Sequence, residues 1–142
     1  MKKNLFIAIA IGTVGCNSPA PNKVAESQKV AEPKYVINFA RDKYNSQKGT
    51  IEDFTQTDTI TAANDTVAYL TAYKKFYNNK IEERENLSLA QWKSFTLTDK
   101  NGVDVTAKLP TTIVVGIQNQ IKNLPEVKKY IDAVNQDSLS IN

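Results

Sequence analysis

The stretch NDTVAYLTAYKKFYNNKIEERE, residues 64–85, decides the fold because it carries the clearest helical pattern in the chain. Asn64 and Asp65 offer an N-cap directly before the pattern begins, and Glu82–Glu85 forms a solvated acidic end. Its apolar side chains recur at helical spacing and form one stripe, which consists of Val67, Leu70, Tyr73, Tyr77 and Ile81 and is widened by Tyr69 and Phe76. We therefore predict a helix that buries this stripe against the rest of the protein.

A second signal lies at Asn101-Gly102, between two runs in which apolar and polar residues alternate. Asn-Gly in this position is the strongest short-range signal of a β-hairpin, because both central residues of a type I′ turn need positive φ. The apolar positions are Phe95 and Leu97 before the turn and Val103, Val105, Ala107 and Leu109 after it. The sequence therefore predicts two antiparallel strands here, with Trp92 in the same hydrophobic neighbourhood.

The segment before the long helix divides into two parts. Pro33 suits a first helical position, and Gly49 ends the helix that the pattern predicts. The apolar residues at helical spacing in this part are Tyr35, Val36, Phe39, Ala40 and Tyr44. Residues 51–61 are rich in Thr and predict an extended or irregular segment.

Two more helices are expected in the C-terminal third. One follows Thr112, although the β-branched residues 113–115 leave a third strand as the alternative, and Pro125 opens the last helix. Together these segments predict a small single α+β domain over residues 33–142. About three to four helices would pack on an antiparallel β-hairpin or short sheet.

The first sixteen residues have the parts of an export signal. Two lysines form a positive head, an apolar run extends over residues 5–14, and small Gly15 stands just before Cys16, the only cysteine in the chain. The run is too short to span a bilayer. The segment resembles a bacterial lipoprotein signal peptide with its lipobox, although Thr13 stands where that family most often has Leu.

The resemblance implies that residues 1–15 are removed, that a diacylglyceryl group is attached to the sulfur of Cys16, and that the new amine is acylated. Residues 16–32 then form the lipidated end and a flexible tether. Asn17 stands where some bacteria read Asp as an inner-membrane retention signal, which favours the outer membrane. The alternatives are a buried N-terminal helix or a plain membrane anchor with an incidental cysteine.

The charge of the chain indicates no nucleic-acid partner. The sequence has 18 Lys and Arg against 15 Asp and Glu, and two of the lysines belong to the signal segment, which leaves 16 against 15. A nearly neutral domain has no strong field with which to attract a polyanion. The expected partners are therefore the membrane, through the lipid, and another envelope protein or an incoming protein.

The chain contains no His, which removes the commonest general base, the His-dependent nucleophiles and most zinc sites. Residues 99–104 resemble a calcium loop only faintly, because Gly102 is fourth in the loop and no Glu follows within twenty residues. We therefore predict no catalytic residue, no metal site and no cofactor. The alternative is a His-free envelope hydrolase that acts on glycans through carboxylates, for which the candidates are Glu52, Asp53, Glu82, Glu83 and Glu85.

Aromatic side chains interleave with lysines over residues 69–80. One interpretation is a core stripe with lysines on its flanks. The other is a surface patch that binds a partner, with Tyr69, Tyr73 and Tyr77 as the candidate residues.

A short pattern of Asp, then Ser or Thr, then an aliphatic residue occurs at residues 58–60, 65–67 and 137–139. It resembles the O-glycosylation site of exported proteins in the Bacteroides group. The resemblance implies sugar attachment at Thr59, Thr66 and Ser138. In the second copy, the same residues also serve as a helix cap and a first-turn residue.

Together these features predict a lipid-anchored protein of the bacterial envelope with a binding or structural role and no catalysis. An immunity or inhibitor protein that neutralises an incoming toxin or hydrolase is a specific version. Small size, an anchor and the lack of a recognisable catalytic set all fit that version.

Substitution of Cys16 by Ala should abolish lipid attachment and block cleavage before residue 16, because the sulfur is the expected attachment point. Labelling of cells with a fatty-acid probe, followed by mass spectrometry of the N-terminus, measures both effects. Equal labelling of the variant and the parent protein would contradict the lipobox interpretation.

Overall fold

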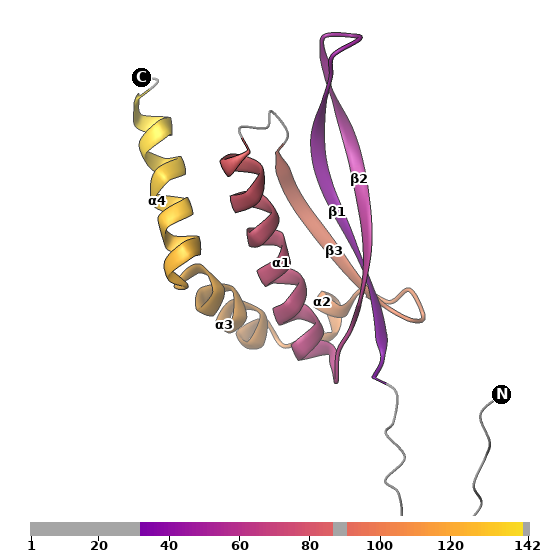
Figure 1. The fold of residues 1–142 in the computed structure, drawn as a ribbon. Helices are drawn as coiled ribbons and strands as arrows, with labels where there is room; N and C mark the ends of the chain where they lie inside the picture. Colours follow the sequence, from indigo (N-terminus) through magenta and orange to yellow (C-terminus); the bar gives the residue numbers. More distant parts are fainter. Residues whose placement is uncertain (1–31, 87–90, 141–142) are drawn as a thin grey trace, which may run out of the picture. The chain divides into compact units, whose positions relative to one another are not determined.

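The elements of the structure combine an N-terminal β-hairpin, a long helix, a third strand and three C-terminal helices (Figure 1). The computed structural model describes residues 32–86 and 91–140, so the predicted signal peptide, Cys16 and the tether up to residue 31 lie outside the described residues. The predicted α+β class is confirmed. In chain order the elements are β1 (Lys34–Asn45), β2 (Thr50–Thr61), α1 (Asp65–Glu85), β3 (Trp92–Asp99), α2 (Val105–Lys108), α3 (Thr111–Lys122) and α4 (Pro125–Ser140).

Strand β1 lies at the centre of a three-stranded antiparallel sheet with the order β2-β1-β3. It pairs with β2 along its whole length, from Lys34 opposite Thr61 to Asn45 opposite Thr50. It pairs with β3 only as far as Arg41. Beyond that residue β2 is its only partner strand within the described chain, and the β1–β2 hairpin projects past the other elements (Figure 1).

The prediction of a helix after Pro33 is wrong, because this segment forms β1. Tyr35, Ile37 and Phe39 are 3%, 0% and 0% exposed, which is the two-residue alternation of a strand with one buried face. Tyr35 and Phe39 are four residues apart and share a face in either a helix or a strand, so their spacing does not distinguish the two. The pairing of β1 with two other strands decides for the extended form. The Thr-rich segment forms β2, as the extended alternative predicted.

The turn after β3 is present, but its geometry differs from the prediction. The N–H of Asp99 donates to the carbonyl of Val103 at 3.0 Å, and the N–H of Gly102 donates to the carbonyl of Asp99 at 2.9 Å. These bonds enclose residues 100–102, whereas a type I′ turn encloses two residues. Gly102 has φ = 77°, the left-handed conformation that glycine adopts freely.

The strand predicted over residues 103–109 is wrong, because the short helix α2 stands in its place. Thr98 and Asp104 form an isolated β-bridge just after the turn. The side chain of Asp104 then accepts a hydrogen bond from the N–H of Thr106 at 2.7 Å and caps α2. Helical backbone turns Val105 into the core, where it is fully buried.

Helix α1 begins as predicted, because the side chain of Asn64 accepts a hydrogen bond from the N–H of Val67 at 3.0 Å. Most of the predicted stripe faces the core, since Tyr73 and Tyr77 are buried and Leu70 packs against the core, but Val67 does not. Val67 is 40% exposed, whereas Ala68 and Ala72 are fully buried. The small alanines let the helix backbone approach the sheet, and larger aromatic side chains fill the space beside them. The buried residues of α1 are Ala68, Tyr69, Ala72, Tyr73, Phe76 and Tyr77.

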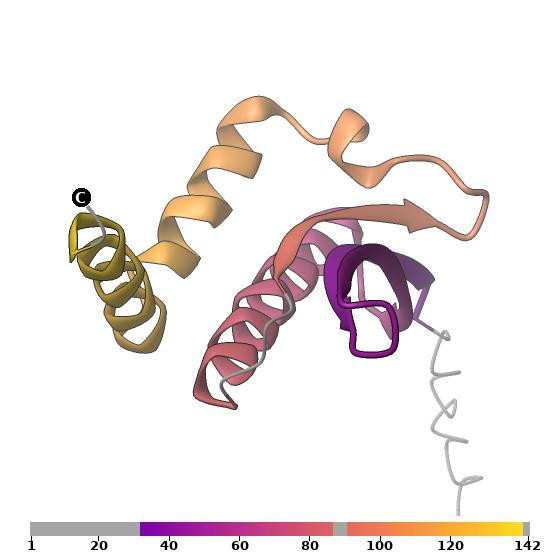
Figure 2. The same ribbon diagram turned by 90° about the horizontal axis from the view of Figure 1, so that it is seen from above.

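The core lies between α1 and one face of the sheet (Figure 2). Phe39 of β1 is fully buried, and its ring centroid lies 6.5 Å from that of Phe76, 5.3 Å from Trp92 and 6.2 Å from Phe95. Such aromatic pairs contribute about 0.5–1.5 kcal/mol each beyond the burial of their area. Phe39 therefore joins β1, α1 and β3 at one point.

Helices α3 and α4 pack against α1, and no helix among the described residues covers the other face of the sheet (Figure 2). The alternative of a strand at residues 113–115 is wrong, because they lie inside α3. Ile117 and Ile121 form the buried face of that helix. Helix α4 begins at Pro125, as predicted, and Val127 anchors its first turn in the core.

Substitution of Phe39 by Ala should lower the free energy of unfolding by about 3–5 kcal/mol, because it leaves a cavity where three elements meet. Val67→Ala is the control, since the sequence patterns predict that Phe39 and Val67 are both apolar residues on a buried face. It should cost less than about 1 kcal/mol because Val67 is largely in solvent. Urea unfolding of both variants measures the difference, and equal costs would contradict this packing.

Candidate functional site

The three tyrosines proposed as a partner-binding patch are buried in the core. Tyr69, Tyr73 and Tyr77 are 3%, 8% and 9% exposed, so the core interpretation is confirmed and the surface-patch alternative is wrong. Tyr73 packs edge-on against Tyr77 at 5.4 Å and also contacts Tyr69 and Phe95. The Tyr69 hydroxyl accepts a hydrogen bond from the Gln118 amide at 3.0 Å. Burial raises the pKa of Tyr73, as expected of a phenol that serves packing.

The carboxylates of the hydrolase alternative are divided between two parts of the fold. Glu52 and Asp53 lie on β2, and hydrogen bonds from Lys48 and Lys93, respectively, hold the pKa of each carboxyl below its ordinary value. A general acid needs a raised pKa instead. Glu82, Glu83 and Glu85 lie near the end of α1, and Glu82 and Glu85 are exposed to solvent.

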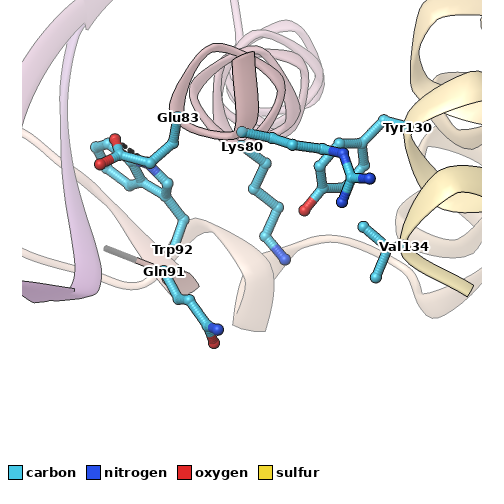
Figure 3. A pocket seen from close by; sticks show the side chains of 7 residues that line it. Lys80, Glu83, Gln91, Trp92, Tyr130 and Val134 are labelled. Carbon is cyan, nitrogen blue, oxygen red and sulfur yellow. Dashed lines mark hydrogen bonds between the residues drawn. The ribbon is translucent and has the colours of Figure 1, made fainter. Parts of the chain in front are cut away.

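A recess of about 360 Å³ lies where the end of α1, the start of β3 and α4 come together (Figure 3). We call it the α1–β3–α4 recess. Among its described lining residues Glu83 is the one carboxylate, so the recess lacks the pair that a glycan hydrolase needs. Its walls are formed by Lys80, Glu83 and Arg84 of α1, by Gln91 and Trp92, and by Tyr130 and Val134 of α4.

Two lining residues of the recess, Glu83 and Trp92, form a network with Arg41 of β1. One oxygen of Glu83 lies 3.2 Å from Nη2 of Arg41, and the other accepts a hydrogen bond from the indole N–H of Trp92 at 3.2 Å. The guanidinium carbon of Arg41 lies 4.6 Å from the centre of the Trp92 ring. Both charged side chains are less than one-fifth exposed. The charge of Glu83 is therefore neutralised by Arg41, and its hydrogen bond with the indole N–H orients the Trp92 ring.

The remaining charged walls are cationic. Lys80 lies with its ammonium 4.8 Å from the centre of the Phe76 ring, and burial lowers its pKa. Arg84 forms an ion pair with Asp137 at 2.8 Å. Burial raises the pKa of Tyr130, whose hydroxyl therefore stays protonated as a hydrogen-bond donor.

A different surface lies on the projecting part of the β1–β2 hairpin, residues 42–54, which we call the distal hairpin. Tyr44, Ile51 and Phe54 are 43%, 63% and 47% exposed. Tyr44 and Ile51 are directly opposite each other in the register, and Phe54 lies on the other face of the hairpin, where Lys43 places its ammonium 5.8 Å from the ring centre. Apolar side chains therefore occur on both faces of the distal hairpin.

The turn at the tip of the distal hairpin is well held by hydrogen bonds. The side-chain oxygen of Asn45 accepts from the N–H groups of Gln47 and Lys48 at 3.1 and 3.3 Å. Its carbonyl accepts from the N–H of Gly49 at 2.8 Å, and Gly49 has φ = 65°. These bonds fix the tip in one conformation.

Strand β3 braces the base of the distal hairpin. The ammonium of Lys93 lies 2.7 Å from Asp42 and 2.8 Å from Asp53, which are opposite each other on β1 and β2. Hydrogen bonds to these carboxylates raise the pKa of Lys93. The N–H of Asp42 also donates to the carbonyl of Gln91 at 2.9 Å. The hairpin therefore leaves the sheet at a fixed point.

The candidate O-glycosylation residues Thr59, Thr66 and Ser138 are all exposed. They lie on β2, in the first turn of α1 and near the end of α4, respectively. The structure places them on three separate elements. Their use as attachment residues stays a prediction.

Comparison with protein-family models, with curated proteins and with solved structures found no match in any of the three. Among the described helices, none is both long and apolar enough to cross a membrane. Within residues 32–86 and 91–140, no three or more His, Cys, Asp and Glu side chains gather where they could hold a metal ion.

Substitution of Glu83 by Gln should destabilise the domain by about 1–3 kcal/mol, because the largely buried guanidinium of Arg41 loses its counterion. Glu52→Gln is the matched control, since its ion pair with Lys48 lies in solvent and its loss should leave the unfolding midpoint unchanged. Thermal unfolding, followed by Trp92 fluorescence, measures both variants. An unchanged midpoint for Glu83→Gln would show that the network does not stabilise the domain.

Proposed function

We propose that the protein is a lipid-anchored protein of the bacterial envelope that binds another protein through its distal hairpin and performs no catalysis. The observation that carries the proposal is the exposure of three large apolar side chains, Tyr44, Ile51 and Phe54, on a hairpin that projects beyond the core (Figure 1). The membrane anchor comes from the lipobox resemblance at residues 1–16.

The exposed side chains Tyr44, Ile51 and Phe54 lie outside the hydrophobic core. The core forms where β1 faces α1 and β3, and past Arg41 the only strand paired with β1 in the described chain is β2. Exposed apolar groups that gather at one place typically mark an interaction surface. Aromatic and large aliphatic side chains at such a surface are the residues that bury the most area on binding.

The distal hairpin is also held rigid before any partner arrives. Its strands are paired without interruption, its turn is closed by hydrogen bonds from Asn45, and Lys93 braces its base. A surface that is ordered in advance loses little conformational entropy on binding. A rigid, narrow projection with apolar groups on both faces suits a concave site on the partner. The active-site cleft of an incoming toxin or hydrolase has that shape, which favours the immunity or inhibitor version.

The point at which the chain enters the domain leaves the distal hairpin accessible. The tether joins β1 at Lys34, and the tip of the hairpin follows Asn45 at the opposite end of the same strand. A strand of this length spans roughly 35–40 Å. The predicted lipidated segment is therefore connected in sequence to the end of β1 that is opposite the proposed binding surface.

Photo-crosslinking in the bacterium that produces the protein tests the proposal. Benzoylphenylalanine replaces Ile51 in one full-length variant and Val115 in another, since Val115 is also apolar, 45% exposed and located on α3. The proposal predicts an adduct with an envelope or incoming protein from position 51 and none from position 115. The double substitution Tyr44→Ser and Phe54→Ser should then remove the adduct at position 51.

The same double variant is unfolded with urea to separate binding from folding. Its midpoint should stay close to that of the parent, because both side chains lie outside the core and are close to half exposed. Equal adducts from positions 51 and 115, no adduct from position 51, or an adduct that survives the double substitution would each overturn the proposal.

A further inference from the structure

The α1–β3–α4 recess carries one positive charge that no described carboxylate compensates. Glu83 is paired with Arg41 at 3.2 Å, and Arg84 is paired with Asp137 at 2.8 Å. Lys80 forms no ion pair with any residue in the described part of the chain, and its ammonium has the Phe76 ring as its neighbour. The charges within each of these two ion pairs cancel, so the charge of Lys80 is the one left without an opposite charge among the described residues of the recess.

The position of Lys80 makes its positive charge energetically unfavourable when no ligand is bound. Its side chain extends from α1 into the space between the Trp92 side and the Tyr130 side of the recess (Figure 3). Burial lowers the pKa of Lys80, because the surrounding protein replaces part of the water around the ammonium. A bound anion would restore the lost stabilisation, and it would do so where water is partly excluded and the attraction is stronger.

We propose that the α1–β3–α4 recess binds a carboxylate, with the Lys80 ammonium as its counterion and Trp92 among the residues that line the site. Gln91 and Tyr130 line the same space and offer neutral hydrogen-bond donors. The oxygens of Glu83 contact Arg41 and Trp92, and Glu83 forms no ion pair with Lys80 in the structure. The site is distinct from the distal hairpin, and the proposal goes beyond the protein-binding function.

The size of the recess limits the ligand. A volume of about 360 Å³ is near the lower end for small-molecule sites, so it admits one sugar or one amino-acid unit. A cation in a compact recess suits the carboxylate of an acidic sugar, and it equally suits the carboxyl end of a short peptide. The shared chemistry is a carboxylate on a compact body, and the two sources are separate arms of the test.

The fluorescence of Trp92 provides the test, because it is the only tryptophan in the chain and it lines the recess. The full-length lipoprotein in detergent micelles is titrated with sodium glucuronate in one arm and with N-acetyl-leucine in the other. Glucose and N-acetyl-leucinamide are the matched neutral compounds, and sodium chloride keeps the ionic strength constant. We expect a saturable change in emission with at least one of the carboxylates and none with the neutral compounds.

Variants of Lys80 make the test specific. Lys80→Gln should weaken carboxylate binding about tenfold or more, because a charge-assisted hydrogen bond is lost. Lys80→Arg should retain binding, and Lys74→Gln is the matched control on the exposed side of the same helix. The unfolding midpoint of Lys80→Gln should be unchanged or higher, since a poorly solvated charge is removed, which shows that the variant is folded.

Each outcome decides the proposal. A response to glucuronate alone or to N-acetyl-leucine alone supports it and identifies the source of the carboxylate. The absence of a saturable response in both arms overturns it. An equal response to the neutral compounds, or a response that Lys80→Gln leaves unchanged, also overturns it, because Trp92 would then report something other than a charge on Lys80.

Discussion

The contact of Phe39 with Phe76, Trp92 and Phe95 holds the long helix against the sheet, and most of the structure depends on it. Strand β1 supplies the only fully central position in the sheet of the described chain, and Phe39 is the largest of its fully buried side chains. Once α1 is fixed on this ring, its far side is available to α3 and α4. The helices therefore lie on one side of the sheet, with α1 between the sheet and α4 (Figure 2), and the hairpin projects past them.

The sequence predicts the elements whose signals are local. The N-cap at Asn64, the helix start at Pro125 and the glycine turn at Gly102 are each specified by neighbouring residues, and the structure contains all three. The identity of β1 is not local, because the side chains of Tyr35 and Phe39 would share a face in a helix as well. Two pairings decide the form of this segment, one with β2 and one with β3, and the β3 partners lie more than fifty residues later in the chain.

The residues of the recess could not be found from the sequence, because they come from three elements with no common motif. Lys80 and Glu83 lie on α1, Trp92 opens β3, and Tyr130 lies on α4. Glu83 was a candidate for catalysis on the basis of residue type alone, and its partner Arg41 had no signal at all. Packing of α4 beside α1 creates the recess, and that packing depends on which face of α1 is buried. The three tyrosines are in the core, as the predicted apolar stripe requires, so they offer no surface patch for a partner.

The network of Arg41, Glu83 and Trp92 belongs to both proposed binding surfaces. Arg41 is the last residue of β1 that pairs with β3, so it marks the point where the hairpin leaves the sheet. Through Glu83 and Trp92 it also forms a wall of the recess. A change in the network would therefore disturb both surfaces together, whereas Ile51 and Lys80 each belong to one surface. The two binding functions are independent in the side chains that would contact a ligand, and they share only the scaffold that positions them.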